Sequence, residues 1–313
     1  MPSFVEYFHR GRSKYRAVVH LVNAQQRYTV EDVSRPEAWA RMLRTVVVPK
    51  KTILFYPKRP QRWNVIYKLC SRAGYWITTN PRRTCDAAFR WDNATRSVPR
   101  SFRYDAGAIN LHCTDISKRH VSDVFADVFG YDLGVDPTTY HGLVVKKSDE
   151  NATHDGEVIE CPIPAEDVDP GFAYQKAIDN RRDDADGFYE YRVPVFLKTI
   201  PAVYVKYRPS EAQFKEFNGA EVVAPDSVLS DQERDDILAF TEALGLEYGE
   251  LDVLRDRGDG RIYVVDANNT PSGPTRGFEP AQRVEALETL QPAYEALLAE
   301  SARRIAQASA GGR

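Results

Sequence analysis

The sequence has few cysteines and no long apolar run, and both absences narrow the class of protein. Its 313 residues include four cysteines, Cys70, Cys85, Cys113 and Cys161, which are scattered and form no Cys-x-x-Cys pair. This spacing indicates neither a zinc site nor a disulfide framework. No apolar run approaches the roughly 20 residues of a membrane-spanning helix, and the first residues lack the apolar core of a signal peptide. We therefore expect a soluble, cytoplasmic protein.

Acidic residues are almost absent from one stretch of the chain. Residues 41–104 contain 15 Lys and Arg but only 2 Asp and Glu, so 27 of the 42 basic and 43 of the 45 acidic residues lie elsewhere. A basic surface raises the local concentration of anions. The asymmetry favours a phosphorylated, sulfated or carboxylated substrate, although an ordinary solvated surface fits it as well. Nucleic acid is less favoured, because the interleaved aromatic residues have spacings that suit a core.

Strands and helices alternate in the first third of the chain. The predicted elements are strands at 52–56, 75–79 and 86–91, a helix at 63–74, and an earlier helix that begins near Ser34 and Pro36. This alternation predicts a small parallel α/β lobe. Nearer the C-terminus, a helix at 228–245 begins with a Ser230–Glu233 capping box, and residues 279–308 form one or two amphipathic packing helices.

The most informative pattern is a hairpin that carries three oxygen-bearing side chains. Asp252 lies inside one apolar run, the segment 257–261 is a turn with an Asp-Gly signal, and 262–266 is rich in β-branched residues. Asp266 and Asn268 end the second strand. Because antiparallel strands lie side by side, these side chains can converge and bind Mg²⁺, which prefers oxygen ligands. An ordinary hairpin with acidic strand ends is the alternative.

Several lysines and arginines occur where they could bind phosphate. Lys118 lies in the first turn of a helix that Ser117 can cap, and a cation there opposes the helix dipole. A bound phosphate would offset that cost, although a surface lysine is the simpler explanation. Within the strand 141–147, neighbouring side chains face opposite ways, so either Lys146 or Lys147 points inward.

Two further strands, 189–196 and 201–209, are predicted to pair. They bring Arg192, Lys206 and Arg208 toward one sheet surface. Such cations suit a γ-phosphate and the charge that develops during its transfer. A solvated sheet face is the alternative.

Taken in order from about Asn110 to Gly273, these motifs resemble the ATP-grasp superfamily, which has a glutathione-synthetase-like ATP-binding fold. The resemblance rests most on Asp252 followed by Asp266-Ala-Asn268. It implies an α/β plus α+β protein in which a small N-terminal α/β lobe precedes two α+β subdomains that clamp ATP. The implied boundaries are 1–108, 109–183 and 184–313.

The resemblance also implies roles for individual residues. The metal ligands would be Asp252, Asp266 and Asn268, holding Mg²⁺ or, alternatively, Mn²⁺. Lys118 and Lys146 would contact the phosphates, and Lys206 would also lie in the nucleotide site. Lys146 is preferred to Lys147 because the family has a Val-Val-Lys pattern. The adenine hinge would be Gln175, Lys176 and Ile178, with Asp179 at the ribose.

Two arginines, Arg192 and Arg255, would be catalytic. The polar turn 148–156 resembles the flexible loop over the triphosphate. Within that turn, His154 and Asp155 either contact the phosphates or substrate or only shape the turn.

These motifs are consistent with two reactions, which differ in the group that accepts the phosphoryl group. A ligase would transfer the γ-phosphoryl group to a carboxylate and let an amine displace it. The segments 252–256, 264–268 and 206–210, together with Asp rather than Glu at 266, also resemble the inositol-polyphosphate kinase branch, in which the acceptor is a hydroxyl. We rank ligase first, kinase second and a non-catalytic ATP-binding protein third. The expected partner is an anionic small-molecule or peptide acceptor, with no membrane and with a homodimer as one assembly.

Overall fold

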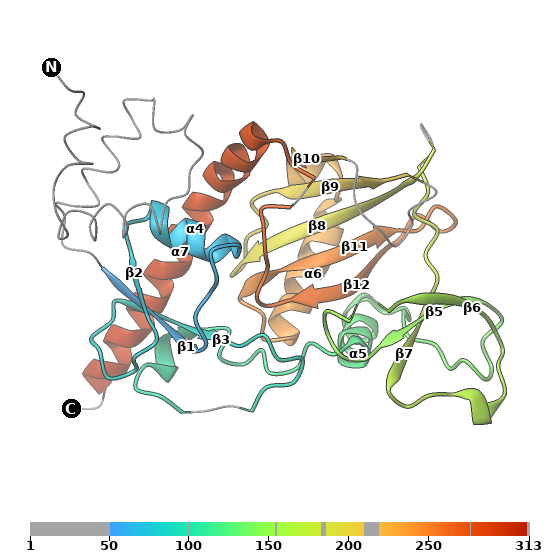
Figure 1. Cartoon of the computed structure of the whole chain (residues 1–313), viewed down its shortest axis with the longest axis horizontal. Coiled ribbons are helices and arrows are strands. Elements are labelled where there is room, and N and C mark those ends of the chain that lie inside the picture. The colour runs from blue at the N-terminus through green and yellow to red at the C-terminus, as the bar shows by residue number, and fades with distance from the viewer. Residues whose placement is uncertain are drawn as a thin grey trace, which may run out of the picture.

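The computed structural model describes residues 51–98, 101–153, 155–182, 186–209, 219–275 and 277–311. The helix predicted near Ser34 and the turn residue His154 lie outside these ranges. Three sheets follow one another along the chain, and Figure 1 shows the first at one end of the molecule and the other two at the opposite end. None of the helices among the described residues combines the length and apolarity that crossing a bilayer would need.

The first sheet confirms the predicted parallel α/β lobe. Its strands are β1 (Thr52–Pro57), β2 (Trp76–Thr78), β3 (Ala87–Trp91) and β4 (Ala108–Ile109), and the helix α4 (Val65–Arg72) connects β1 to β2. The strand order is β2-β1-β3-β4, and every pair is parallel. A parallel sheet is covered on both faces, and residues 53–55 of β1 and all five residues of β3, which include Arg90, are correspondingly buried.

The C-terminal residues form one helix, α7 (Pro280–Gly311), which packs on this first sheet (Figure 1). Ser301, fully buried, donates to the carbonyl of Gly107 at 2.6 Å and accepts from the Ala88 amide at 2.9 Å. A Cβ at Gly107 would lie 2.3 Å from Ile305 Cγ1, so only glycine permits this approach. The C-terminal helix therefore packs closely against the first sheet.

The second sheet is small and antiparallel. It contains β5 (Gly142–Ser148), β6 (Glu157–Cys161) and β7 (Phe172–Lys176) in the order β6-β5-β7. The preceding helix, α5 (Lys118–Phe129), contacts both β7 and the neighbouring large sheet. The Ser117 side chain does not cap α5 as predicted; instead the Asp149 carboxylate accepts from the Arg119 amide at 2.9 Å.

The third sheet is antiparallel, with the order β10-β9-β8-β11-β12. Its strands are β8 (Phe188–Phe196), β9 (Val203–Arg208), β10 (Gly219–Val223), β11 (Tyr248–Arg255) and β12 (Ile262–Asn268), with helix α6 (Asp231–Ala243) before β11. The predicted hairpin is confirmed, since β11 and β12 pair. The capping box of α6 is also confirmed: Ser230 accepts from the Glu233 amide, and Glu233 accepts from the Ser230 amide.

The two faces of the third sheet differ in polarity. Leu251, Val253 and Ala267 are fully buried in one apolar cluster with α5 and α6. Because side chains alternate along a strand, the residues between them point to the other face. That second face carries five of the predicted site residues, Arg192, Lys206, Asp252, Asp266 and Asn268.

Candidate functional site

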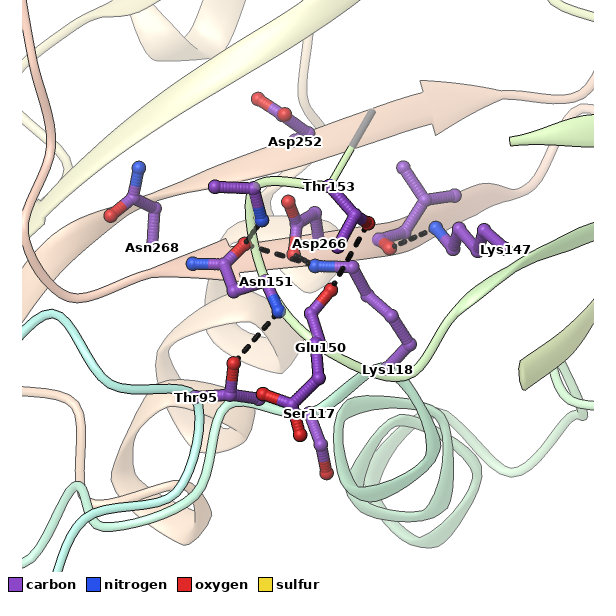
Figure 2. A network of polar contacts seen from close by, with 12 residues as sticks. Thr95, Ser117, Lys118, Lys147, Glu150, Asn151, Thr153, Asp252, Asp266 and Asn268 are labelled. Carbon is purple, nitrogen blue, oxygen red and sulfur yellow. Dashed lines mark hydrogen bonds and ion pairs between the residues drawn. The ribbon is translucent and has the colours of Figure 1, made fainter. Parts of the chain in front are cut away.

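The predicted metal ligands lie on adjacent strands and on the same face. Asp252 of β11 pairs in register with Asp266 of β12, and Glu250 pairs with Asn268. A register shift follows Asp252 and places Val264, rather than Val265, opposite Val253. Side chains directly opposite on antiparallel strands have Cβ atoms roughly 5 Å apart. Figure 2 shows Asp252, Asp266 and Asn268 along these two strands.

Arg192 of β8 neutralises Asp252. Its Nε and Nη2 atoms donate to the two carboxylate oxygens, each at 2.8 Å, and its Nη1 lies 3.5 Å from Glu250. Burial acts to raise the pKa of Asp252, but the facing guanidinium outweighs it and holds that pKa below its usual range. These two parallel hydrogen bonds fix the Asp252 carboxylate in one orientation.

Glu250 is a site residue that the sequence analysis did not identify. It lies two positions before Asp252, so strand alternation places both on one face. Its side chain is 3% exposed, and burial raises its pKa to about 7 against the opposing charge of Arg192. The two-residue spacing was the available signal.

Lys118 points from the start of α5 to the metal-ligand face. Its Nζ forms an ion pair with Asp266 Oδ1 at 2.5 Å and donates to Asn151 Oδ1 at 3.1 Å (Figure 2). The residue is only 6% exposed. A cation at a helix start is unfavourable by itself, and here the carboxylates of Asp149 and Asp266 offset that cost.

The structure turns Lys147, rather than Lys146, toward this site. Lys147 Nζ donates to the Val265 carbonyl at 2.9 Å (Figure 2), and desolvation lowers its pKa to about 8 although the Asp266 charge opposes the shift. Lys146 instead pairs with Glu157 at 3.4 Å and lies over the Phe172 ring. The preference for Lys146 therefore does not match the geometry.

The donor chemistry at this face suits Mg²⁺. Two carboxylates and an amide are hard oxygen donors of the kind that Mg²⁺ takes together with substrate phosphates. Across the described ranges no cluster of three or more His, Cys, Asp and Glu could hold a metal, and the predicted set has two such residues with Asn268 as the third donor. Asn268 Oδ1 also accepts from the Thr270 amide at 2.9 Å, which fixes its orientation.

The residues predicted to contact adenosine lie where the chain passes from the second sheet to the third. The Gln175 amide nitrogen donates to Ser122 Oγ at 2.9 Å inside the protein. Lys176 meets the Tyr263 hydroxyl at 2.9 Å and two carboxylates of the hairpin turn at 3.3 Å. Ile178 is buried in the core, and Asp179 pairs with Arg181. The three polar side chains thus have protein partners, and Ile178 packs among apolar residues.

The remaining predicted cations divide between two places. Lys206 and Arg208 both pair with Glu190 on the polar face of the third sheet. Arg255 lies near the hairpin turn, where it bonds both carboxylate oxygens of Glu233 and the Gly260 carbonyl at 2.7–3.0 Å. Its guanidinium holds the start of α6 against β11, and these hydrogen-bond partners lie away from the metal-ligand face.

Comparison with models of protein families finds no match, and comparison with curated proteins finds no match either. Comparison with solved structures does find matches. D-alanine–D-alanine ligase from Bacillus anthracis aligns with a TM-score of 0.53 and 12% identity over 83% of this chain and 99% of the other. The ATP-grasp ligase PsnB complexed with minimal precursor aligns with a TM-score of 0.51 and 13% identity over 81% and 100%.

A complex of PsnB with a phosphomimetic variant of its minimal precursor, Mg and ADP has 18% identity and a TM-score of 0.39, and this chain spans 59% of it. The two fuller alignments each cover more than four-fifths of this chain. The chain has the ATP-grasp fold.

Proposed function

We propose that this protein is a magnesium-dependent ATP-grasp ligase that joins a carboxylate to an amine through an acyl phosphate. One observation carries the proposal: Asp252 and Asp266 face each other in register, with Arg192, Lys118 and Lys147 around them. Two carboxylates that lie beside three cations would hold a metal ion and the phosphates of a nucleotide. The similar folds of the two ligases named above support the reaction class.

The reaction has two steps. A carboxylate oxygen of the acceptor bonds to the γ-phosphorus of ATP while the bond from that phosphorus to the β,γ-bridging oxygen breaks, which releases ADP. The amine nitrogen then bonds to the carbonyl carbon of the acyl phosphate, inorganic phosphate leaves, and the nitrogen loses a proton. The products are an amide, ADP and phosphate.

The residues of this chain would act mainly by position and charge. Asp252, Asp266 and Asn268 would hold the cation, and bound Mg²⁺ would neutralise the β- and γ-phosphate oxygens. Lys118 and Lys147 would contact the phosphates. Arg192, fixed by two hydrogen bonds to Asp252, would present positive charge where the γ-phosphoryl group moves.

The acceptor side would lie between the first lobe and the segment that follows β12. Asn64 donates to the carbonyls of Thr270 and Pro271, both at 3.1 Å, and Lys68 donates to the Gly273 carbonyl. These bonds hold the segment after the metal ligands against the basic lobe. Trp63, beside them, is 63% exposed, and an exposed aromatic next to basic residues suits an anionic acceptor that also has apolar parts.

A peptide acceptor is consistent with this surface. PsnB, which has a similar fold, was solved with its minimal precursor and with precursor peptide. We propose a peptide acceptor for this protein as well, and a small-molecule carboxylate is the alternative acceptor. We propose that the domains comprise residues 1–108, 109–183 and 184–313. The helix α7 belongs to the third range but packs on the sheet of the first lobe.

The function is tested by following ADP and phosphate together. The purified protein is given ATP, Mg²⁺ and a panel of carboxylates and acidic peptides, with and without amines. Release of ADP and phosphate that requires an amine supports a ligase. A phosphorylated product without phosphate release would instead show the kinase chemistry of the alternative. If ATP with Mg²⁺ gives no thermal shift, the nucleotide site itself is wrong.

A further inference from the structure

The connection between β5 and β6 is held by the first lobe. Arg96 lies just beyond β3, and its guanidinium forms ion pairs with Asp149, with Glu150 at 3.1 Å and with Asp115 at 3.4 Å. The Asn151 amide donates to Thr95 Oγ1 at 2.8 Å (Figure 2). Two adjacent residues of the first lobe thus bind three consecutive residues of this connection.

The same three residues continue into the proposed phosphate site. Asp149 accepts from the Arg119 amide at 2.9 Å and so caps α5, the helix that presents Lys118. Asn151 Oδ1 accepts from Lys118 Nζ at 3.1 Å, and that Nζ pairs with Asp266. A continuous path of polar contacts therefore runs from Arg96 and Thr95 to a proposed metal ligand.

Burial gives the Asp149 contacts more weight than an exposed ion pair would have. Asp149 is 3% exposed, and its pKa is held below the usual range: burial acts to raise it, but hydrogen bonds from the Arg119 amide and Arg96 outweigh that effect. A buried carboxylate that loses one of its cations keeps the cost of desolvation. Arg119 still pairs with Asp149 at 3.1 Å, so removal of Arg96 weakens the arrangement without abolishing it.

We propose that Arg96 and Thr95 are positioning residues, through which the first lobe sets the β5–β6 connection, and with it Lys118, over the phosphates of ATP. The proposal rests on the proposed function, since it takes the Lys118–Asp266 region as the nucleotide site. It gives a role to Arg96, which lies outside the β11–β12 hairpin yet contacts the loop whose Asn151 binds Lys118. Binding of the acceptor beside the first lobe and binding of ATP would then be coupled through these contacts.

The test uses the full chain with Arg96→Ala, Arg96→Lys and Thr95→Val, and with Arg82→Ala as the control. Arg82 is an exposed arginine of the same lobe. Hydrogen exchange is followed in peptides that cover residues 148–153 and, for comparison, β11 and β12. We expect faster exchange in 148–153 for Arg96→Ala and Thr95→Val, unchanged exchange in β11 and β12, and partial restoration in Arg96→Lys.

Steady-state kinetics provide the second readout. Arg96→Ala is expected to raise KM for ATP about tenfold with kcat changed less than about threefold, because binding rather than chemistry is weakened. Wild-type exchange in 148–153, or faster exchange with an unchanged KM, would overturn the proposal. If the wild-type protein turns over no ATP, the proposed function fails, yet the exchange of the ligand-free variants still decides whether Arg96 and Thr95 hold the loop.

Discussion

Lys118 and Asp266 form an ion pair of 2.5 Å between Nζ and Oδ1, although 148 positions separate them in the chain. The lysine begins α5 and the aspartate lies on β12, so the pair joins the proposed phosphate site to the proposed metal site. A bound cation would be the largest local charge beside Asp266. We expect bound Mg²⁺–ATP to replace Lys118 as the partner of the Asp266 carboxylate. The Lys118 ammonium group would then bind phosphate oxygens.

Asp266→Asn is expected to lower Mg²⁺-dependent turnover by at least about 100-fold, because the charge that would hold the metal is lost. The fold should persist with a loss of about 3 kcal/mol or less, because the buried Lys118 loses its carboxylate partner but keeps its hydrogen bond to Asn151. ADP release and the thermal shift with Mg²⁺–ATP measure the two effects. Asp226→Asn, an exposed carboxylate shortly before α6, is the control and should keep the shift. A normal rate in Asp266→Asn would contradict the site assignment.

The two lysines of β5 should differ sharply in their effect. Lys147→Met is expected to reduce kcat/KM for ATP by about 100-fold, because Lys147 is the one that lies near Asp266. Lys146→Met should change it by less than about threefold, since that side chain pairs with Glu157 on the other face. Equal losses in both variants would mean that β5 lies differently in the nucleotide complex. Steady-state kinetics with varied ATP give the comparison.

The case of these lysines shows where sequence reasoning ends. Val144 and Val145 precede Lys146 and Lys147, so the apolar pattern cannot be phased and either lysine can face inward. The structure shows that Val144 is fully buried with Tyr174, which fixes the phase. Only the pairing of β5 with its neighbours supplies that information.

Local patterns, by contrast, were sufficient for several elements. The capping box of α6 and the β11–β12 hairpin depend on residues within a few positions of one another, so the sequence alone predicts them. The cap of α5 does not, because Asp149 lies 30 positions from Arg119. The same is true of Arg96, whose ion pairs with Asp149 and Glu150 span 53 and 54 positions of the chain. Such long-range contacts leave no periodic signal.

Arg192 should matter for stability as well as for catalysis. Arg192→Met would leave Asp252 and Glu250 without their main cation in a largely buried setting, which we expect to lower the free energy of unfolding by about 3 kcal/mol. Lys198→Met removes a surface pair in which both side chains are more than two-thirds exposed, and should cost less than about 0.5 kcal/mol. Urea denaturation measures both. Similar small losses would show that Arg192 does not stabilise this face.

The buried thiols should make stability fall at alkaline pH. Burial raises the pKa of Cys70 and of Cys113 to about 12, against an unfolded value of about 8.5. Because the native state keeps these protons after the unfolded chain has lost them, stability is complete below pH about 8.5. It then declines by up to about 1.4 kcal/mol per pH unit for each thiol until the native pKa is reached.

Urea denaturation at a series of pH values between 8 and 10 measures this slope, and the slope should be smaller in Cys70→Ala than in the wild type. At pH 8 all four thiols should react slowly with a thiol reagent in the native protein and at once in urea, because each is buried. A Cys70→Ala variant with an unchanged slope, or a thiol that reacts rapidly in the native state, would contradict the burial of Cys70 between α4 and α7, where its sulfur lies 2.9 Å from the Tyr294 hydroxyl.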